Sequence, residues 1–352
     1  MYKRQISASH NTYYDNGIKL LNSAGEKMDE EVIRQLESYL DADPMSIPYA
    51  RRDRIGKTVD YYGGRNQYIG YLISLSRHSF QGYKVGLDCA NGSTWMIAKA
   101  VFDALGAQTY VINNQPTGTN INLNSGSTHI EHLQQFVKNN RLDVGFAFDG
   151  DADRCLAVDA TGAVVDGDHI MAILALDLKE QGKLHNNTLV ATIMSNLGLT
   201  LACRKFGFKH HASKVGDRYV LESLKEKDWK LGGEQSGHII STDYAPTGDG
   251  IAASLMVLRA LAGRDLAGAK VMEKLPQTLV NVAVAEREAI AGAKTVWDAV
   301  DAANSELEGH GRVLVRASGT EPLVRVMVEV PTQEEAERIC SDLVGLVEAE
   351  LG

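Results

Sequence analysis

The sequence lacks the features that mark nucleic-acid-binding, secreted or membrane proteins. It has no cluster of lysines and arginines and a formal net charge of −9, so a nucleic acid is not an expected partner. No apolar run is long enough to cross a bilayer. The first residues, MYKRQISASHN, do not contain the apolar core of a signal peptide. We therefore expect a cytoplasmic protein that has no membrane partner.

Cysteine is scarce and widely spaced. No two of the cysteines form a CxxC pair, which argues against a zinc site or a disulfide framework and suggests a reducing compartment. Apolar residues make up 44% of the chain and charged residues 23%, ordinary values for a globular protein. The 352 residues are enough for roughly two or three domains. The cysteines are Cys89, Cys155, Cys203 and Cys340.

Strand and helix patterns alternate through most of the sequence, which is typical of parallel α/β units. Ser93 is placed to cap the first predicted helix, and Gly207 to end a later one. Two apolar runs around Thr161 and Gly162 interrupt the alternation and predict a hairpin. The alternating segments, beginning with a strand, are 83–90, 93–107, 108–113, 129–140 and 143–149. After the hairpin, beginning with a helix, they are 169–183, 188–193, 196–207, 230–240 and 248–263.

The order of elements changes from about residue 277. A strand, a helix, two strands and a closing helix predict a small antiparallel sheet with helices on one side. We therefore expect an α/β protein in four parts. These are a remnant of a first α/β domain at 1–78, α/β domains at 79–168 and 169–272, and a C-terminal α+β domain at 273–352. Functional-looking sequence begins only at Ile6, so most of the first domain is expected to be missing.

Three aspartates follow directly after a predicted strand in DVGFAFDGDADRCLAV (143–158). They are Asp149, Asp151 and Asp153, and Arg154 comes next. Carboxylates this close repel one another, and burial adds to the cost. A hard cation bound by their oxygens offsets both effects. Ligand sites in α/β sheets lie at the carboxyl ends of strands, so a metal site is favoured over the alternative, a solvated acidic turn.

The spacing of the aspartates does not fit a calcium-binding EF-hand. With Asp149 in the first loop position, Arg154 stands where glycine is required and Ala160 where the bidentate glutamate is required. Magnesium needs few carboxylates and keeps coordination positions for water and phosphate. Mg²⁺ is therefore the expected cofactor.

Two further stretches carry polar side chains in suggestive arrangements. ISASHNTYYDNGIK (6–19) surrounds Ser9 with small residues but lacks the GxSxG pattern of a hydrolase nucleophile, so a turn or helix cap is the alternative. In LGGEQSGHII (231–240), Glu234, Ser236 and His238 alternate. In an extended segment they would face one side, where a carboxylate and a hydroxyl suit sugar hydroxyls. A polar edge strand fits this stretch equally well.

A fourth stretch, VRASGTEPLVR (315–325), predicts a phosphate site. A glycine-containing turn with two hydroxyls lies between two arginines, which suits a phosphate cradle. The GxxxxGK[ST] pattern of a P-loop is absent, and a plain hairpin turn is the alternative. The residues of this predicted cradle are Arg316, Ser318, Gly319, Thr320 and Arg325.

These four stretches, in this order, resemble the α-D-phosphohexomutase family from Ile6 to the C-terminus. The resemblance implies a multidomain phosphohexomutase-like α/β fold with mixed sheets and a C-terminal α+β domain. It also implies an isomerase that moves a phosphoryl group between O6 and O1 of a hexose, through a phosphoserine and a bisphosphorylated sugar. The matching motifs are ISASHN with DNGIK, DGDADR, GGEQSGH and RASGTEPLVR.

The resemblance assigns a role to each motif. Ser9 would carry the phosphate and, with Asp149, Asp151 and Asp153, bind Mg²⁺. Arg154 would lie beside the transferring phosphate, while Lys19 and His238 are the implied acid–base residues. Glu234 and Ser236 would hold the sugar hydroxyls in either orientation of the sugar. The phosphate that does not react would be held by Arg316, Ser318, Gly319, Thr320, Arg325 and Lys214, and His10 would contribute to substrate binding beside Ser9.

Further stretches, among them MSNLGL and KVGDRYVLE, resemble the branch of the family that acts on hexosamine phosphates. This implies glucosamine phosphate as the substrate, its bisphosphate as the intermediate, a role in UDP-N-acetylglucosamine and cell-wall synthesis, and a homodimer. A mannose or glucose phosphate mutase, or an inactive sugar-phosphate-binding fragment, is the alternative. The sequence departs from the family pattern in two ways. Thr12 replaces the proline of family SHNP loops, and the expected first domain is incomplete. We therefore expect the chain as written to expose a sheet edge and to have negligible mutase activity, while its last three domains bind sugar phosphate weakly.

Overall fold

The computed structural model describes residues 3–42, 49–57, 59, 61–76, 78–318 and 322–352. These residues form two compact units. The first comprises Met1–Met194 with Phe208–Lys270, and the second comprises Ser195–Gly207 with Val271–Gly352. Each unit is described by itself.

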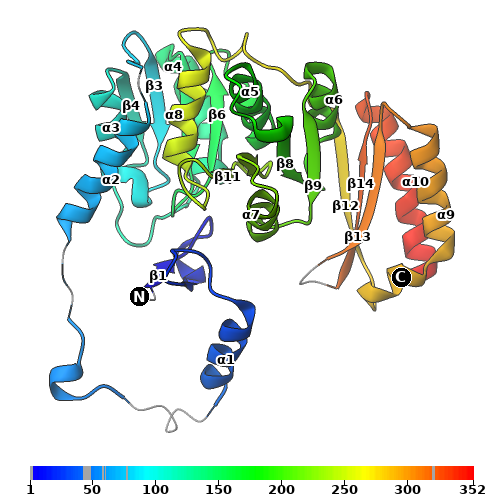
Figure 1. The fold of residues 1–352 in the computed structure, drawn as a ribbon. Coiled ribbons are helices and arrows are strands. Elements are labelled where there is room, and N and C mark those ends of the chain that lie inside the picture. The colour runs from blue at the N-terminus through cyan, green and yellow to red at the C-terminus, as the bar shows by residue number, and fades with distance from the viewer. Residues whose placement is uncertain (1–2, 43–48, 58, 60, 77, 319–321) are drawn as a thin grey trace. The chain divides into compact units, whose positions relative to one another are not determined.

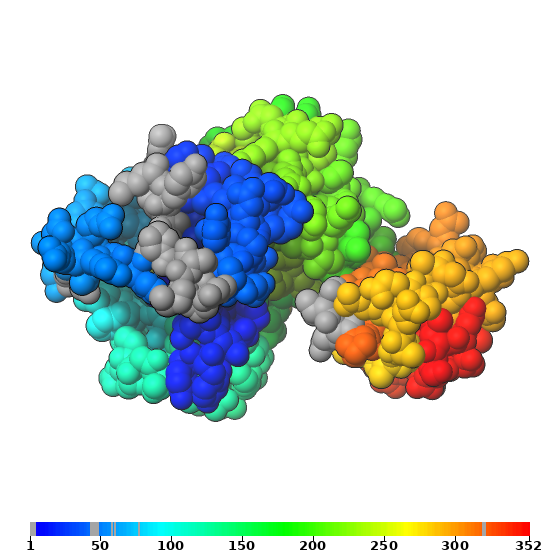
Figure 2. Space-filling view, turned by 90° about the horizontal axis from the view of Figure 1, so that it is seen from below, coloured from blue at the N-terminus to red at the C-terminus, as the bar shows by residue number. Residues whose placement is uncertain are grey.

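The N-terminal segment of the first unit begins with a two-stranded antiparallel sheet (Figure 1). It pairs β1 (Lys3–Ser7) with β2 (Gly17–Leu21), and α1 (Glu30–Leu40) follows without a buried residue. The sheet leaves apolar side chains in solvent, because Ile6 is 77% exposed and its strand partner Ile18 is 69% exposed. Figure 2 shows this segment, in blue, lying on one face of the first unit.

A five-stranded mixed sheet follows in the order β4-β3-β5-β6-β7. The first three strands are parallel, and the last two form the antiparallel hairpin predicted at Thr161 and Gly162. Gly162 has a positive φ of 83°, which the turn requires and glycine adopts without a steric cost. The strands are β3 (Lys84–Asp88), β4 (Gln108–Ile112), β5 (Val144–Phe148), β6 (Cys155–Asp159) and β7 (Val164–Val165).

Strand β5 is buried along its whole length because helices cover both faces of the sheet. Ala147 packs against α4, whereas Phe146, one residue earlier, faces the other side and contacts Phe102 of α3 at 5.9 Å between ring centroids. Side chains alternate between the two faces of a strand, which explains the continuous apolar run. The helices around this sheet are α2 (Tyr62–Leu75), α3 (Ala98–Ala104), α4 (Glu131–Asn140) and α8 (Gly250–Leu261).

The predicted cap at Ser93 is wrong. A 3-10 turn at Ser93–Met96 precedes α3, and no side chain caps either element. The reason lies in the backbone, because the N–H of Ser93 donates to the carbonyl oxygen of Gly150 at 2.8 Å. This contact fixes the start of the segment against the aspartate loop instead of leaving it to begin a helix.

A four-stranded sheet in the order β11-β10-β8-β9 completes the first unit. The segment 230–240, predicted as one strand, is two antiparallel strands joined by a turn. Strand β9 and helix α7 were not predicted. Strand β9 has the polar sequence KHHAS, without an apolar pattern, and lies at the edge of the sheet. The elements are α5 (Gly167–Glu180), β8 (Thr188–Thr192), β9 (Lys209–Ser213), α7 (Asp217–Glu226), β10 (Leu231–Gly233) and β11 (Ile239–Ser241).

The second unit confirms the predicted antiparallel sheet, with strand order β12-β14-β13. Helices α9 and α10 pack against the strands and each other (Figure 1), around a core of mainly valine side chains. Helix α6 (Leu197–Phe206) belongs to this unit and ends at Gly207, as predicted. The other elements are β12 (Gln277–Ala283), α9 (Lys294–Glu306), β13 (Arg312–Ala317), β14 (Leu323–Glu329) and α10 (Gln333–Leu351).

No helix in the described part of the chain combines the length and apolarity needed to span a bilayer. All four cysteines are buried free thiols. Short 3-10 helices occupy several connections, at Tyr13–Asp15, Arg52–Arg54, Gly126–Thr128, His185–Asn187 and Arg287–Gly292.

Candidate active site

The aspartates after β5 form a compact carboxylate cluster. Oxygens of Asp149, Asp151 and Asp153 lie within 4.8 Å of one another. Within the described residues, Asp149 Oδ2, Asp151 Oδ1 and Asp153 Oδ1 are buried without a hydrogen-bond partner. Because Asp149 is fully buried, the alternative of a solvated acidic turn is wrong. Three inward carboxylate oxygens without partners fit a hard metal ion.

Electrostatics support the same conclusion. Burial, together with the charges of Asp153 and Asp151, raises the pKa of Asp149 to about 8. Burial alone would also raise the pKa of Asp153, but the His238 imidazole, Lys19 and Arg154 outweigh it and hold this pKa below its usual range. Ionisation of Asp149 is therefore unfavourable in this buried position, and a bound cation would favour its carboxylate form.

The backbone shapes the aspartate loop. The N–H of Arg154 donates to Asp149 Oδ1 at 3.1 Å, and Arg154 Nε lies 4.0 Å from Asp149 Oδ2. Only glycine fits at position 150, because a Cβ there would lie 2.6 Å from the carbonyl oxygen of Ser9. The aspartate loop and the serine loop therefore pack closely together at position 150.

The serine loop is attached to this cluster through Ser7. Ser7 Oγ donates to Asp151 Oδ2 at 2.8 Å and accepts the N–H of Ser9 at 2.9 Å. Ser9 itself has a φ of 53° and its Oγ lies 3.4 Å from His10 Nδ1. Burial, followed by the charge of Arg154, lowers the pKa of His10. No described helix begins at Ser9, so the helix-cap alternative is wrong, whereas the predicted turn is present and is closed by the Asn11 N–H and the Ala8 carbonyl.

Lys19 reaches the same aspartates from β2. Its Nζ lies 2.5 Å from Asp151 Oδ2 and 3.7 Å from Asp153 Oδ2. Burial lowers the pKa of Lys19, but the hydrogen bond and charge of Asp151 outweigh burial and raise it above the ordinary value. Lys19 therefore presents a protonated amine beside the cluster.

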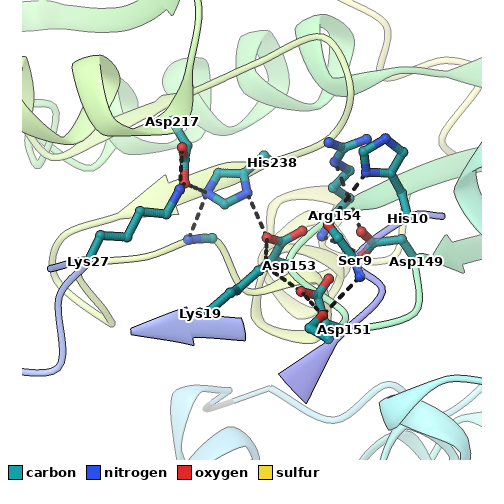
Figure 3. Close-up of polar contacts among 12 residues, drawn as sticks. Ser9, His10, Lys19, Lys27, Asp149, Asp151, Asp153, Arg154, Asp217 and His238 are labelled. Atoms are coloured by element: carbon teal, nitrogen blue, oxygen red, sulfur yellow. Dashed lines mark hydrogen bonds and ion pairs between the residues drawn. The ribbon is translucent and has the colours of Figure 1, made fainter. Parts of the chain in front are cut away.

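His238 lies between two carboxylates (Figure 3). Its Nδ1 is 3.5 Å from Asp153 Oδ2, and its Nε2 is 3.7 Å from Asp217 Oδ2 and accepts the N–H of Gly248 at 3.2 Å. Lys27 binds both carboxylate oxygens of Asp217, with Nζ 2.7 Å from Oδ1 and 2.5 Å from Oδ2. Sequence reasoning missed Asp217 and Lys27, because only the tertiary fold brings them to His238.

The predicted geometry of the sugar loop is wrong. Glu234, Ser236 and His238 do not alternate along an extended segment, because a turn closed by the Gly237 N–H and the Glu234 carbonyl joins β10 to β11. Gly237 has a φ of 92°. Glu234 Oε1 instead accepts the N–H of Gly216 at 3.1 Å. Among the described residues, Ser236 Oγ is buried without a hydrogen-bond partner, so it can still bind a ligand.

The aspartate loop and the sugar loop are joined through their backbones. Arg154 and His238 form an isolated antiparallel bridge, and the N–H of Cys155 donates to the Gly237 carbonyl at 3.0 Å. Lys214, one of the predicted phosphate-binding residues, is exposed, and its Nζ lies 5.6 Å from the centre of the Tyr219 ring.

A cavity of about 630 Å³ adjoins the cluster. It lies between the N-terminal segment and helix α7, and Ser9 is not among the residues that line it. The fold thus places the two acid–base residues implied by the sequence, Lys19 and His238, around the same cavity as two of the aspartates. Its charged lining includes Lys19, Lys27, Asp151, Asp153, Asp217 and His238.

The predicted phosphate loop lies in the second unit. Arg316 of β13 and Arg325 of β14 stand directly opposite each other. Burial and the charge of Arg325 lower the pKa of Arg316, whose Nε is buried without a hydrogen-bond partner in the described part of the chain. Ser318 is 3% exposed and donates its N–H to Leu323 at 2.8 Å. Facing guanidinium groups repel and suit a bound anion. Gly319 and Thr320 fall outside the described residues.

Models of one protein family match consecutive segments of the chain. Profiles of the phosphoglucomutase/phosphomannomutase family match at residues 4–45 (α/β/α domain I), 66–162 (α/β/α domain II), 166–279 (α/β/α domain III) and 279–346 (C-terminal domain).

Two curated relatives are both phosphoglucosamine mutases. A phosphoglucosamine mutase of Lachnospira eligens is 52% identical over 347 residues, which cover 98% of this chain and 77% of that protein. One from Lachnoclostridium phytofermentans is 49% identical, and the match covers 96% of this chain and 76% of that protein. The chain thus spans about three quarters of the length of these relatives.

Solved structures agree on the fold. A phosphoglucomutase/phosphomannomutase family protein from Burkholderia thailandensis has a TM-score of 0.77 at 21% identity, over 99% of this chain and 76% of that one. Aspergillus fumigatus N-acetylphosphoglucosamine mutase, solved in complex with GlcNAc-6P and magnesium, also has a TM-score of 0.77, at 19% identity, over 100% of this chain and 89% of that one. The predicted fold class is confirmed.

Proposed function

The chain belongs to the phosphoglucomutase/phosphomannomutase family, and we propose that it interconverts glucosamine 6-phosphate and glucosamine 1-phosphate. The names of its relatives favour this reaction over the glucose and mannose alternatives. The observation that carries the proposal is the connection of Ser9 to the carboxylate cluster through Ser7 and Asp151. A hydroxyl placed beside a metal-binding cluster suits transfer of a phosphoryl group.

In the proposed reaction, Ser9 carries a phosphoryl group in the resting state. The bond between phosphorus and the Ser9 oxygen breaks as a bond forms to O1 or O6 of the sugar phosphate. The proton of that sugar hydroxyl passes to a side-chain base, and a side-chain acid donates a proton to the Ser9 oxygen as it leaves. Lys19 and His238, which both lie within 4.0 Å of Asp153, are the residues we propose for proton transfer. The bisphosphate then turns around and returns its other phosphoryl group to Ser9.

The carboxylate cluster fits the Mg²⁺ expected from the sequence. Asp149, Asp151 and Asp153 supply three oxygens without partners among the described residues, and the phosphate on Ser9 would supply a further ligand. Bound there, Mg²⁺ would offset the negative charge of the transferring phosphoryl group. Arg154, whose Nε is 4.0 Å from Asp149, would add positive charge on the same side.

Substrate binding is assigned to three groups of residues. We propose that Glu234 and Ser236 hold the sugar hydroxyls, because a carboxylate and a hydroxyl can bind them in both orientations. His10 would contact the substrate next to Ser9. The remote phosphate, which positions the reacting one, would be bound by Lys214, Arg316, Ser318, Gly319, Thr320 and Arg325.

Two further proposals are a cytoplasmic location, which rests on the features of the sequence, and a homodimer, which rests on family resemblance. Sedimentation of the purified protein tests the homodimer.

The reaction itself is tested by incubating the protein with glucose 1,6-bisphosphate and Mg²⁺ and measuring its intact mass. We expect a single phosphate adduct at Ser9.

The substrate is tested by adding sugar phosphates to the phosphorylated protein and following loss of the adduct. Glucosamine 6-phosphate should remove the phosphate faster than glucose 6-phosphate or mannose 6-phosphate does. Faster removal by mannose 6-phosphate would support the alternative mutase. Sugar-phosphate binding without any adduct would support the inactive binding fragment.

A further inference from the structure

We propose that Asn122 is a positioning residue for Ser9. It lies in the loop between β4 and α4, 113 residues from Ser9, and matches none of the four motifs that indicated the function. Its side-chain amide holds the serine loop in the conformation that turns Ser9 toward the aspartates. The inference rests on the proposed role of Ser9 as the phosphate carrier.

The contacts of Asn122 identify its target. Its Nδ2 donates to the carbonyl oxygen of Ser9 at 2.8 Å and to that of Asn11 at 2.7 Å. Both partners are acceptors, which settles the orientation of the amide, because only the NH₂ group can donate to them. The side chain is almost fully buried, at 2% exposed, so these bonds are protected from competing water.

Ser9 needs such support because its backbone is unfavourable for serine. Its φ of 53° lies in the left-handed region, which residues with a Cβ rarely adopt. The N–H of Asn11 closes a turn onto the carbonyl of Ala8 at 2.9 Å. A turn with positive φ at its second residue favours glycine or asparagine over serine. Hydrogen bonds to the carbonyls of Ser9 and Asn11 therefore stabilise a conformation that the local sequence disfavours.

Asn122 is itself anchored to the five-stranded sheet that contains β3. Its N–H donates to the Ala90 carbonyl at 2.9 Å, and the N–H of Ala90 donates to the buried Asp88 at the end of β3. Asn113 Nδ2 donates to both oxygens of Asp88 at 3.0 Å. The position of the serine loop is thus set by a rigid strand end, and rigid support is what a reacting group requires.

Asn122 also passes beside the aspartate loop. A Cβ at Gly150 would lie 2.6 Å from Asn122 Nδ2 and 2.6 Å from the Ser9 carbonyl oxygen. One glycine therefore allows the amide, the serine loop and the aspartate loop to meet. Asn122 Oδ1 is buried and has no hydrogen-bond partner within the described ranges. An unpaired buried acceptor is unfavourable for folding, and the two bonds donated by Nδ2 offset this cost.

The test compares Asn122→Asp, which keeps the shape but removes the N–H donors, with Asn122→Ala, which adds no charge. The matched control is Asn140→Asp on α4, since Asn140 Nδ2 also donates to a backbone carbonyl, that of Phe136, but at an exposed site. Each protein is incubated with Mg²⁺ and increasing glucose 1,6-bisphosphate, and phosphorylation of Ser9 is followed by intact mass. Hydrogen exchange of residues 6–16 reports the order of the serine loop.

Both Asn122 variants should phosphorylate Ser9 about 100-fold more slowly, the scale expected when a reacting group is misplaced by about 1 Å. The bisphosphate concentration that gives half the maximal rate should stay within about twofold, because the hydrogen bonds of Asn122 in the described part of the chain go to Ser9, Asn11 and Ala90 and to no proposed substrate-binding residue. Residues 6–16 should exchange faster in both variants, and Asn140→Asp should match the wild type in every measurement.

Unchanged phosphorylation rates, or unchanged exchange of residues 6–16, in the two Asn122 variants would overturn the proposal. If even the wild type acquires no phosphate at Ser9, the proposed function fails, whereas hydrogen exchange still decides whether Asn122 orders the loop. Thermal unfolding of each variant shows whether the fold is retained. If one variant does not fold, the other provides the comparison with Asn140→Asp.

Discussion

The hydroxyl of Ser7 donates a hydrogen bond of 2.8 Å to Oδ2 of Asp151 and so joins segments 144 residues apart in the sequence. The same hydroxyl accepts the N–H of Ser9. One side chain therefore sets both the turn that carries the proposed phosphate and its distance from the carboxylate cluster. This connection underlies the predictions that follow.

Replacing Asp151 by asparagine should weaken Mg²⁺ binding by at least about tenfold, because one ligand charge is lost and removing even a residue that only supports a ligand typically costs about 10–100-fold in metal affinity. Isothermal titration with Mg²⁺ measures the change. The control is Asp103→Asn, which alters an exposed ion pair with Lys99 on α3. Equal Mg²⁺ affinities for Asp151→Asn and Asp103→Asn would show that the aspartate loop does not bind the metal.

Rising pH should destabilise the metal-free protein through Asp149. Its pKa is raised from 3.8 to about 8 in the folded chain. Between these values the folded state binds a proton that the unfolded state has released, so the free energy of unfolding falls as pH rises. Mg²⁺ displaces this proton, and its affinity should increase over the same window.

Thermal unfolding between about pH 5 and about pH 8, with and without Mg²⁺, checks this prediction. Asp149→Asn cannot ionise and should flatten the pH dependence of the metal-free protein. A wild type and an Asp149→Asn variant with parallel pH profiles would mean that Asp149 is not the titrating group.

Arg316→Ala should weaken binding of glucosamine 6-phosphate by about tenfold or more, since a charge-assisted bond to phosphate contributes roughly 1.5–3 kcal/mol. Arg338→Ala, on the exposed face of α10, should leave binding unchanged. Titration calorimetry compares the two variants. An identical dissociation constant for both would remove the phosphate loop from the proposed site.

Glu329→Gln should destabilise the second unit by about 3 kcal/mol or more, because one side of a buried ion pair is lost. Glu329 is fully buried, and its Oε2 accepts from Arg312 Nε at 2.7 Å and from the N–H of Leu197 at 2.8 Å. Urea unfolding followed by circular dichroism measures the loss. The surface change Glu337→Gln on α10 is the control, and equal stability of these two variants would contradict the prediction.

Local patterns predicted most of the fold and the aspartate cluster. The run from Val144 to Phe148 is apolar because both faces of β5 are buried, and three closely spaced carboxylates after such a strand indicate a cation. Strand β9 escaped prediction because its sequence, KHHAS, has no apolar alternation.

Features that depend on tertiary contacts were not predictable in this way. Ser93 has the side chain of a helix cap, yet its backbone is held by Gly150. The turn that separates Glu234 from His238 arises from the pairing of β10 with β11. Asp217 and Asn122 have ordinary local sequences, and their contacts to His238 and Ser9 exist only in the folded chain.

The central claim is that Ser9 carries the phosphate, and comparison of the wild type with Ser9→Ala tests it most directly. After incubation with glucose 1,6-bisphosphate and Mg²⁺, the intact mass of the wild type should increase by one phosphate, which glucosamine 6-phosphate then removes. Ser9→Ala should fold, bind Mg²⁺ and acquire no phosphate, because it lacks the accepting hydroxyl. A phosphate adduct of equal yield on Ser9→Ala would contradict the account.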